Sequence, residues 1–370
     1  MSKKQTKFTK FDQQMMRHCL KVAAKGKGFT NPNPMVGAVI VKNGEIISEG
    51  YHEHIGGPHS EINAINEANT DLKGAHIYVN LEPCAHYGKT PPCSLAIIKH
   101  EFSKVFIANI DPNPLVSGKG IENLRKAGIE VEIGLLEKEA YKLNEKFFHF
   151  MNTGKPFVTL KTATSLDGKI ATYYGESQWI TCDESRKKVH ELRQEYSAIL
   201  VGINTVINDN PALTTRLEGK VANPIKVILD TALKTPHDFK VLSDKAPLII
   251  ATTRMASKAR ISEFDRYDHV QVWNCPLKNG YVDIEYVINK LGEAGIDSVL
   301  VEGGGSINFS VVQHHLAQKI YAFVAPKIIG GVTSKTSFTG RGIKHLKDIP
   351  MLSEINYTSI GDDILLEGYF

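Results

Sequence analysis

Apolar and polar residues alternate along the first part of the chain with two different periods. Short apolar runs predict buried strands, and they occupy residues 35–41, 75–81, 105–109 and 129–133. Apolar positions three or four residues apart predict amphipathic helices, and they occupy residues 11–25, 59–67, 94–100, 121–127 and 136–148. Asn43-Gly44 separates the first strand from a returning strand at residues 45–50 and is a strong β-hairpin signal. Strands and helices in this order predict a sheet layered with helices.

The alternation continues after residue 156, with a change of character at the junction. An aromatic-rich helix end meets the turn Asn152-Thr153-Gly154-Lys155-Pro156, which predicts domains of residues 1–152 and 153–370. Further strands are predicted at residues 157–163, 198–202, 225–230, 248–252, 270–273, 298–302, 319–324 and 364–370. Helices are predicted from a Thr181/Glu184 capping box to Gln194, over residues 282–294, and after residue 306. This pattern predicts a second α/β domain.

Composition and charge narrow the class of protein. A chain of 370 residues is too long for one ordinary core and predicts two domains. Hydrophobic residues make up 42% and charged residues 23%, as in soluble globular proteins, and no run of about 18 apolar residues predicts a membrane span. A net charge of +4 is too small to predict a nucleic-acid partner. Five cysteines and the lack of a signal-peptide core predict a reduced, cytoplasmic protein.

The stretch that ends at Cys93 carries the clearest chemistry of the chain. His59 and Glu61 form a His-x-Glu motif, and two Pro-Cys pairs follow, with Cys84 and Cys93 as their thiols. One imidazole and two thiolates suit tetrahedral zinc with one position open for a water molecule, whose pKa the metal lowers to near 7. Glu61 is close enough in sequence to reach that water and move its proton. The pattern is a signature of zinc-dependent base deaminases.

Other interpretations of this stretch stay open. The usual signature has Cys-x-x-Cys, whereas eight residues separate Cys84 from Cys93 here. The metal could instead be structural, with His86 as a fourth ligand, in a chain that binds nucleic acid or another protein. Structural sites usually have four protein ligands, however, and only three residues fit well. The remaining alternative is two unrelated thiols and a surface imidazole.

The segments NPNPMVGAVIV, HSE and EPCAHYGKTPPC resemble the deaminase domain of the bifunctional riboflavin-biosynthesis deaminase–reductases. The resemblance covers the first predicted domain, and the family shares the long cysteine spacing. It implies a cytidine-deaminase-like α/β/α sandwich. The implied site residues are the zinc ligands His59, Cys84 and Cys93, the proton shuttle Glu61, and the substrate contacts Asn33, His52 and Lys89.

A glycine-rich turn in the second domain points to a phosphate-bearing cofactor. Residues 303–306, Gly-Gly-Gly-Ser, join a predicted strand to a predicted helix, where side-chain-free residues let backbone N–H groups approach a phosphate. The spacing differs from the GxGxxG of the dinucleotide-binding Rossmann fingerprint, so that fold is not predicted. A tight strand–helix turn without a ligand is the alternative.

The segments KTATSLDGKIA, GESQWIT, INTVINDNPALTTR and VEGGGSIN resemble the reductase domain of the same family. This resemblance implies an α/β domain similar to dihydrofolate reductase that binds NADPH. The implied cofactor contacts are Ala163, Trp179, Thr205, Asp209, Thr231, Gly304, Gly305, Ser306, Ile307, Asn308 and Phe309. The implied substrate contacts are Ser177, Arg193, Leu213, Arg216 and Glu302. Arginine suits a sugar phosphate because its guanidinium binds phosphate through two parallel N–H groups.

Together the two resemblances cover nearly the whole chain and imply one bifunctional enzyme. The first domain would hydrolytically deaminate 2,5-diamino-6-(5-phosphoribosylamino)pyrimidin-4-one, and the second would reduce the ribosyl group to ribityl with NADPH. Lys161, Asp209 and Glu302 are candidates for proton supply or polarisation. The expected partner is a phosphorylated pyrimidine rather than nucleic acid or a membrane, and a homo-oligomer is expected. A tRNA or free-nucleoside deaminase fused to an unrelated reductase is the enzyme alternative.

Overall fold

Residues 8–85, 91–113 and 117–370 are described by the structure, which is a computed structural model. The chain divides into two compact units, Met1–Gly154 and Lys155–Phe370. The boundary predicted at Asn152 lies inside the last helix of the first unit, α6 (Glu145–Thr153). Among the described residues, no helix combines the length and the apolar character that crossing a membrane requires.

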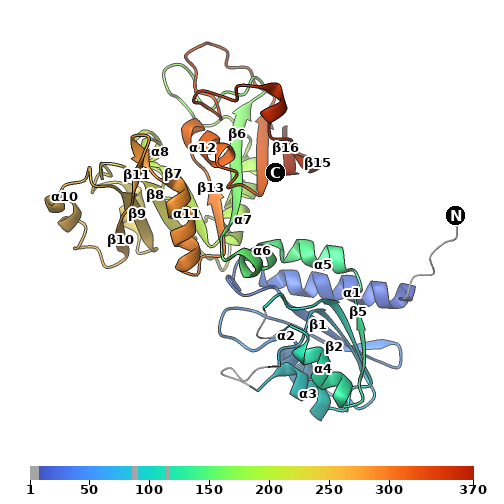
Figure 1. Cartoon of the computed structure of the whole chain (residues 1–370). Coiled ribbons are helices and arrows are strands. Elements are labelled where there is room, and N and C mark those ends of the chain that lie inside the picture. Colours follow the sequence, from blue (N-terminus) through green and yellow to red (C-terminus); the bar gives the residue numbers. More distant parts are fainter. Residues whose placement is uncertain (1–7, 86–90, 114–116) are drawn as a thin grey trace. The chain divides into compact units, whose positions relative to one another are not determined.

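Five strands form the sheet of the first unit, in the order β2-β1-β3-β4-β5 (Figure 1). β1 (Gly37–Lys42) and β2 (Glu45–Tyr51) form the predicted hairpin. Asn43 and Gly44 between them both have positive φ, 54° and 83°, as a type I′ turn requires. β1 also pairs antiparallel with β3 (His76–Leu81), which runs parallel to β4 (Lys104–Asn109). β5 (Glu130–Ile133) completes the parallel part of the sheet.

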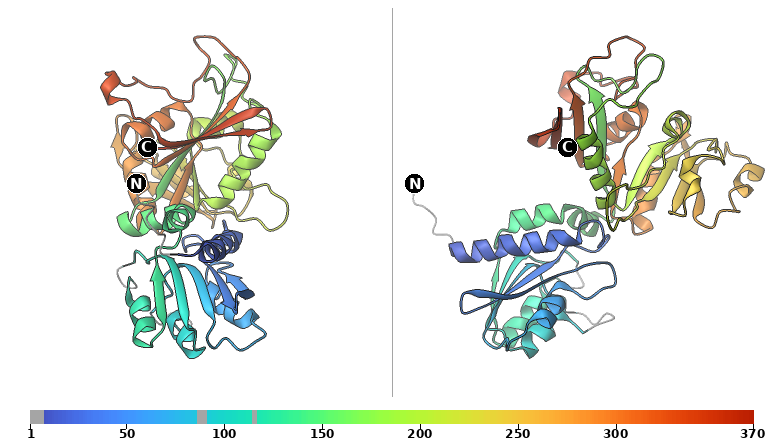
Figure 2. Two further views of the ribbon diagram at one scale, coloured as in Figure 1. Left: turned by 90° about the vertical axis from the view of Figure 1, so that its right-hand side faces the viewer. Right: turned by 180° about the vertical axis from the view of Figure 1, so that it is seen from behind.

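Helices cover both faces of this sheet (Figures 1 and 2). α1 (Lys10–Ala23) and α5 (Glu137–Leu143) pack on one face, and α2 (Ser60–Glu67), α3 (Cys93–Lys99) and α4 (Lys119–Lys126) pack on the other. Strand side chains alternate between the two cores, so Val39 faces α1 and Ile40 faces the α2 side. The predicted α/β/α sandwich is confirmed.

One helix predicted from periodicity is two helices in the structure. The pattern over residues 136–148 predicts a single helix, but α5 and α6 are separated at Asn144, where φ is −113°. The Asn144 amide donates to the Met35 carbonyl oxygen and accepts from the Met35 N–H, each at 2.9 Å. These bonds satisfy both backbone groups of a buried residue just before β1. A tertiary contact therefore interrupts the helical pattern.

The second unit has a nine-stranded sheet in the order β10-β9-β8-β7-β13-β6-β14-β16-β15 (Figure 1). The strands are β6 (Phe157–Ser165), β7 (Ala198–Gly202), β8 (Ile225–Leu229), β9 (Leu248–Thr252), β10 (Val270–Asn274), β13 (Ser298–Val301), β14 (Lys319–Ala325), β15 (Ser353–Ile360) and β16 (Asp363–Tyr369). Neighbouring strands from β10 to β14 run parallel to one another. β16 pairs antiparallel with β14, and β15 pairs antiparallel with β16. A small ribbon joins β11 (Leu277–Lys278) to β12 (Tyr281–Val282).

Helices again cover both faces of this second sheet (Figure 2). α11 (Ile284–Glu293) and α12 (Gly305–Gln313) pack on one face. α7 (Asp183–Glu195), α8 (Ile203–Asp209) and α9 (Lys240–Ser243) pack on the other, where α10 (Lys258–Ser262) adds Ile261 to the core. The predicted α/β architecture is confirmed, and the parallel strands place their carboxyl ends, with the loops that follow, along one edge of the sheet.

Two helix starts in the second unit differ from the prediction. α7 begins after Cys182, not at a Thr181/Glu184 capping box, because the Asp363 carboxylate accepts from the Cys182 N–H at 2.8 Å and the Ser185 hydroxyl at 2.6 Å. α11 begins at Ile284, two residues after its predicted start, because residue 282 pairs in the β11–β12 ribbon. At α7 a partner distant in sequence therefore decides where the helix starts, whereas at α11 a local two-stranded ribbon does.

Candidate metal centre and reductase pocket

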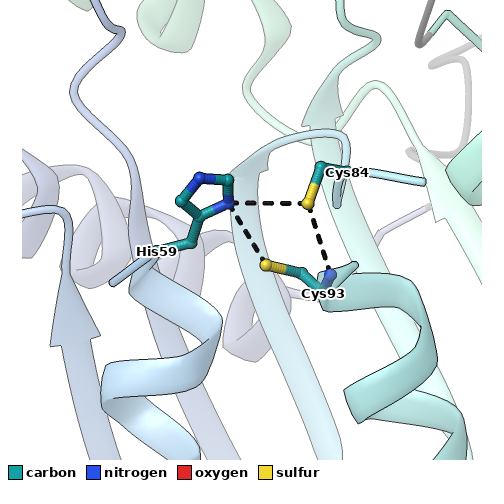
Figure 3. Close-up of side chains that lie close together, drawn as sticks. All are labelled: His59, Cys84 and Cys93. Atoms are coloured by element: carbon teal, nitrogen blue, oxygen red, sulfur yellow. Dashed lines mark hydrogen bonds between the residues drawn. The ribbon is translucent and has the colours of Figure 1, made fainter. Parts of the chain in front are cut away.

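His59, Cys84 and Cys93 converge where three segments of the first unit meet (Figure 3). His59 is the residue before α2, Cys93 is the first residue of α3, and Cys84 follows the end of β3. His59 Nδ1 lies 3.5 Å from Cys84 Sγ and 3.3 Å from Cys93 Sγ. Ligand atoms bound tetrahedrally to one zinc ion are separated by about 3.6 Å. The donor set and its spacing therefore fit zinc.

Within the described residues, this is a group of three candidate ligands whose ligand atoms lie within 4.8 Å of one another. Three protein ligands are typical of catalytic zinc sites, which keep one position for water or substrate. Two residues proposed from the sequence, His86 as a fourth ligand and Lys89 as a substrate contact, lie outside the described residues.

The three candidate ligands shift one another's pKa values. Hydrogen bonding with the Cys93 thiol is the main cause that lowers the pKa of Cys84 to about 4, and the Cys93 N–H, which donates to Cys84 Sγ at 3.3 Å, adds to the shift. The same thiol pairing, together with burial, raises the pKa of Cys93. The hydrogen bond with Cys84 raises the pKa of His59 to about 9. Because metal ligands must give up such protons when a cation binds, the group is suited to a thiophilic divalent metal.

Glu61 is a buried carboxyl group beside these ligands. It is 3% exposed, and its hydrogen-bond donor is the adjacent Ser60 hydroxyl at 3.0 Å. Burial raises the pKa of Glu61, although the charge of His59 opposes the shift. The carboxyl is also near enough to Cys93 to help raise the pKa of that thiol. A buried carboxyl with a raised pKa is suited to proton transfer near neutral pH.

Asn33 and His52 also lie beside the candidate ligands. The rings of His52 and His59 have centroids 5.8 Å apart and are nearly perpendicular. His52 Nδ1 lies 3.0 Å from the Pro58 carbonyl oxygen, an obligate acceptor, so Nδ1 carries the proton. Nε2 is then the acceptor for the Asn33 amide at 3.3 Å. Burial lowers the pKa of His52, which favours this neutral form.

A pocket of about 550 Å³ in the second unit brings together residues from distant segments. Five predicted contacts line it, namely Ala163, Ser177, Trp179, Arg193 and Arg216. Three further basic side chains also line it, namely Lys161, Arg186 and Lys187, and His190 lies beside them. The lining includes only one carboxylate, Asp183. This excess of positive charge suits a phosphorylated ligand.

Arg193 and Glu302, both predicted as substrate contacts, bind each other. Nε and Nη2 of Arg193 donate to the two carboxylate oxygens of Glu302 at 2.7 and 2.9 Å, and Nη1 donates to the Thr214 carbonyl oxygen at 3.2 Å. Burial opposes ionisation of Glu302, but the charges of Arg193 and Lys161 prevail and lower its pKa to about 2. Lys161 Nζ lies 3.6 Å from the same carboxylate. The ion pair therefore supports the pocket, and Arg193 has little capacity left for a ligand.

The candidate phosphate turn lies where β7 and β13, which are parallel neighbours, both lead into helices. A Cβ on Gly303 would lie 2.8 Å from Ile307 atoms, and one on Gly305 would lie 2.5 Å from the Thr336 carbonyl oxygen. A Cβ on Gly304 would meet nothing closer than Thr205 Oγ1 at 3.9 Å. Gly303 and Gly305 are thus needed for packing, whereas Gly304 faces open space beside Thr205, as a phosphate cradle requires.

The other predicted cofactor and substrate contacts divide between the surface and the core. The Ser177 hydroxyl donates to Asp209 at 3.2 Å, so these two predicted contacts lie together. The Thr231 hydroxyl accepts from the Val282 N–H at 3.2 Å. Several side chains instead serve packing: Leu213 and Ile307 pack in or against apolar cores, and Asn308 is 2% exposed and donates to the Ser337 carbonyl oxygen. Phe309 would contact a Cβ on Gly340. Ser306, by contrast, is exposed in the first turn of α12.

The sequence alone missed His190, Arg186 and Lys187 as lining residues of the reductase pocket. All three lie on α7 together with Arg193, and His190 is three residues before Arg193. Residues three or four apart share a helix face, so this spacing was an available signal. Burial and the charges of Arg193 and Arg216 lower the pKa of His190 to about 4, so it is neutral in the pocket at neutral pH.

Comparisons with known proteins match both halves of the chain. Residues 9–109 match the cytidine and deoxycytidylate deaminase zinc-binding region, and residues 156–366 match the RibD C-terminal domain. The riboflavin biosynthesis protein RibD of Actinobacillus pleuropneumoniae is 45% identical over 97% of this chain and 95% of its own length. The Escherichia coli protein of the same name is 35% identical over 96% of this chain and 98% of its own length.

Solved structures match the chain over almost its whole length. Acinetobacter baumannii RibD has a TM-score of 0.88 at 35% identity and covers 97% of this chain and 99% of its own. A diaminohydroxyphosphoribosylaminopyrimidine deaminase/5-amino-6-(5-phosphoribosylamino)uracil reductase from Thermotoga maritima has a TM-score of 0.87 at 41% identity and covers 97% and 98%. Because these relatives carry both halves in one chain, the alternative of a deaminase fused to an unrelated reductase is wrong.

Proposed function

The chain belongs to the RibD family of bifunctional riboflavin-biosynthesis enzymes, and we propose from this premise which residues carry its two reactions. The protein is a zinc-dependent deaminase and an NADPH-dependent reductase. We propose that it deaminates 2,5-diamino-6-(5-phosphoribosylamino)pyrimidin-4-one and then reduces the ribosyl group of the product to ribityl. The observation that carries the first step is the convergence of His59, Cys84 and Cys93 around a site that buried Glu61 borders.

In the deaminase site, His59 Nδ1 and the thiolates of Cys84 and Cys93 would hold the metal. Zinc, when bound, lowers the pKa of a water molecule to near 7. Glu61 accepts the proton of that water and delivers it to the departing ammonia, and its raised pKa supports both roles. Asn33 orients the pyrimidine, with its amide held by neutral His52. Lys89, outside the described residues, is proposed to meet the phosphate.

In the reductase site, NADPH supplies the hydride when bound, and the protein orients it against the acceptor carbon. Gly304 and Thr205 border the space proposed for the cofactor phosphates. Trp179, Ala163 and the remaining predicted cofactor contacts are proposed to hold the rest of NADPH. Arg216 has no ion pair among the described residues, so it is the better candidate for the substrate phosphate than the paired Arg193.

Lys161 is proposed to supply the proton that accompanies hydride transfer to the sugar. Burial lowers the pKa of Lys161, although Glu302 opposes the shift. A lysine with a lowered pKa gives up its proton more readily. The Arg193–Glu302 pair holds the carboxylate 3.6 Å from Lys161 Nζ and thus fixes the position of the ammonium group. Ser177 is proposed to hold the substrate and Asp209, to which its hydroxyl donates, the cofactor.

The test is incubation with the diaminopyrimidinone phosphate, with and without NADPH, followed by mass analysis. Without NADPH, we expect an amino group to be replaced by oxygen and ammonia to be released. With NADPH, we expect the product to gain two hydrogen atoms as well. Deamination of cytidine or guanine in preference to the pyrimidine phosphate would contradict the assigned substrate, and the absence of hydrogen gain would contradict the second step.

We also propose a cytoplasmic location and a homo-oligomeric state. None of the five cysteines, all of them among the described residues, forms a disulfide, as a reducing compartment maintains. Cell fractionation tests the location, and sedimentation equilibrium of the purified protein tests the oligomeric state. A monomer across the micromolar range would contradict the second proposal.

A further inference from the structure

Glu82, two residues before Cys84, places a buried carboxylate between β3 and α4. Its N–H donates to the Asn109 carbonyl oxygen at 2.9 Å and so extends the β3–β4 pairing by one residue. The residue is 4% exposed, and among the described residues it makes no ion pair. A buried carboxylate is costly unless it is fully hydrogen-bonded. The hydrogen-bond donors to the Glu82 carboxylate therefore indicate its role.

Four backbone amides donate to this carboxylate, two of them from residues before α4 and two from its first turn. Oε2 accepts from Gly118 at 2.9 Å and from Asp111 at 3.3 Å. Oε1 accepts from Gly120 at 2.9 Å and from Ile121 at 3.3 Å. The first N–H groups of a helix lack intrahelical partners, and the helix dipole there favours a negative charge. Glu82 thus satisfies the start of α4 from outside the helix.

The chain after Glu82 also lies directly against α4. A Cβ on Gly120 would lie 2.0 Å from the Pro83 carbonyl oxygen, so only glycine allows this approach. On its other side, the next residue is held by α3, because the Ser94 N–H donates to the Cys84 carbonyl oxygen at 3.2 Å and the Cys93 N–H donates to Cys84 Sγ at 3.3 Å. Cys84 therefore lies between the starts of two helices.

We propose that Glu82 is a positioning residue that fixes the thiolate of Cys84 for zinc by clamping its segment to α4. The inference rests on the proposed zinc ligation by Cys84. Glu82 does not touch the metal. It sets the backbone position from which the ligand projects, and Pro83 transmits that position because its backbone packs against Gly120. Mutation of residues that orient metal ligands without touching the metal typically lowers metal affinity by about 10- to 100-fold.

The test compares zinc release from the full-length zinc-loaded protein in the wild type and in Glu82→Gln. The amide keeps the size of the side chain but turns an NH₂ group toward two N–H donors. We expect zinc transfer to an excess of a chromophoric chelator to be about tenfold faster or more. We also expect the difference in Tm between the zinc-loaded and zinc-free forms to shrink, because weaker binding stabilises less.

Three controls separate positioning from general destabilisation. Glu122→Gln makes the same change on the exposed face of α4, where Glu122 pairs with Lys126, and should release zinc at the wild-type rate. Gly120→Ala pushes Pro83 away without changing any charge and should accelerate release as Glu82→Gln does. Reduction of pre-deaminated substrate, which takes place in the other unit, should be unchanged in all variants.

Wild-type zinc release in Glu82→Gln overturns the proposal. So does a lower Tm of the zinc-free form with an unchanged zinc-dependent increment, because that result assigns Glu82 a purely structural role. If Glu82→Gln does not fold, Glu82→Asp retains the charge but is too short to reach both pairs of amides, and wild-type release in that variant overturns the proposal as well. A wild-type protein that binds no zinc at Cys84 would instead contradict the proposed function.

Discussion

Glu61 is the residue on which the proposed deamination depends most directly. Glu61→Gln preserves the size of the buried side chain but can neither accept nor deliver a proton. We expect deamination to fall by about 10²- to 10⁴-fold, with zinc content unchanged because Glu61 is outside the candidate ligand set. Ammonia release measures the first quantity and metal analysis the second. Reduction of pre-deaminated substrate should proceed at the wild-type rate.

A Glu61→Gln variant that deaminates at the normal rate would contradict the assigned mechanism. A variant that loses zinc would instead indicate that the carboxyl holds the metal site together. The two outcomes differ in metal content, so the assay separates chemistry from structure.

Cys84 tests the ligand set in a different way. Cys84→Ser replaces a soft thiolate with a hydroxyl, which is a poor zinc ligand at neutral pH. We expect zinc content to fall to a small fraction of the wild-type value and deamination to be lost with it. Cys182→Ser, a change at a half-buried helix cap in the other unit, is the matched control and should keep full zinc content. Full zinc occupancy in Cys84→Ser would remove this residue from the ligand set.

For single residues, sequence motifs predict which residue types form the site better than they predict which side chains contact one another. The His-x-Glu and Pro-Cys motifs identified the three residues that converge, because the chemistry of zinc restricts the donor types. They did not identify Nδ1 of His59 as the nitrogen that faces both thiols, which depends on the backbone at the start of α2. The pairing of Arg193 with Glu302 spans 109 residues, and no local pattern encodes such a contact.

The Arg193–Glu302 pair joins two elements, α7 and the end of β13, and this makes it a stability feature as well as part of the pocket. Removing one partner of a buried ion pair leaves the other charge uncompensated and costs about 3–5 kcal/mol. We expect Glu302→Gln to destabilise the second unit by that order at pH 7, as measured by denaturant unfolding. Glu285→Gln, at an exposed position on α11, is a control that should change stability little.

The stability that the Arg193–Glu302 ion pair contributes should decrease as the pH falls. The folded-state pKa of Glu302 is about 2, below the value of about 4.3 for an unperturbed glutamate. The stabilisation is therefore fully present above the unfolded value and is lost as the pH falls from about 5 toward 2. The stability difference between wild type and Glu302→Gln should shrink over that window. A difference that grows on acidification would contradict the assigned ion pair.

At the scale of elements, the sequence predicts what is buried and local. β7 and β9 match their predicted bounds because both are short, fully buried apolar runs. β15 was missed because nearly all of its residues are exposed, so it has no apolar alternation to read. α8 was missed because only Val206 among its residues is buried. The break between α5 and α6 was missed because it depends on Asn144 binding the distant Met35 backbone.

For the whole molecule, alternation of strands and helices predicted two α/β units but not the order of their strands. β13 lies between β6 and β7, although at least 95 residues lie between it and either strand in the chain, because a parallel sheet can place a returning strand in its centre. That insertion brings the Gly304 turn beside Thr205 and Glu302 beside Lys161. Pairing of distant strands therefore creates the reductase site, and local sequence patterns do not encode it.

The division into two units leads to a prediction for the whole chain. Each unit has its own sheet and apolar cores, and every residue proposed for one reaction lies in one unit. We therefore expect fragments 1–154 and 155–370, produced separately, to fold and to catalyse deamination and reduction respectively. A mixture of both should complete the two steps, although more slowly than the intact chain at low concentration, because the intermediate must then diffuse between molecules. Circular dichroism checks folding, and mass analysis checks the products. Loss of deamination in a folded, zinc-loaded 1–154 fragment would show that the second unit contributes to the first site.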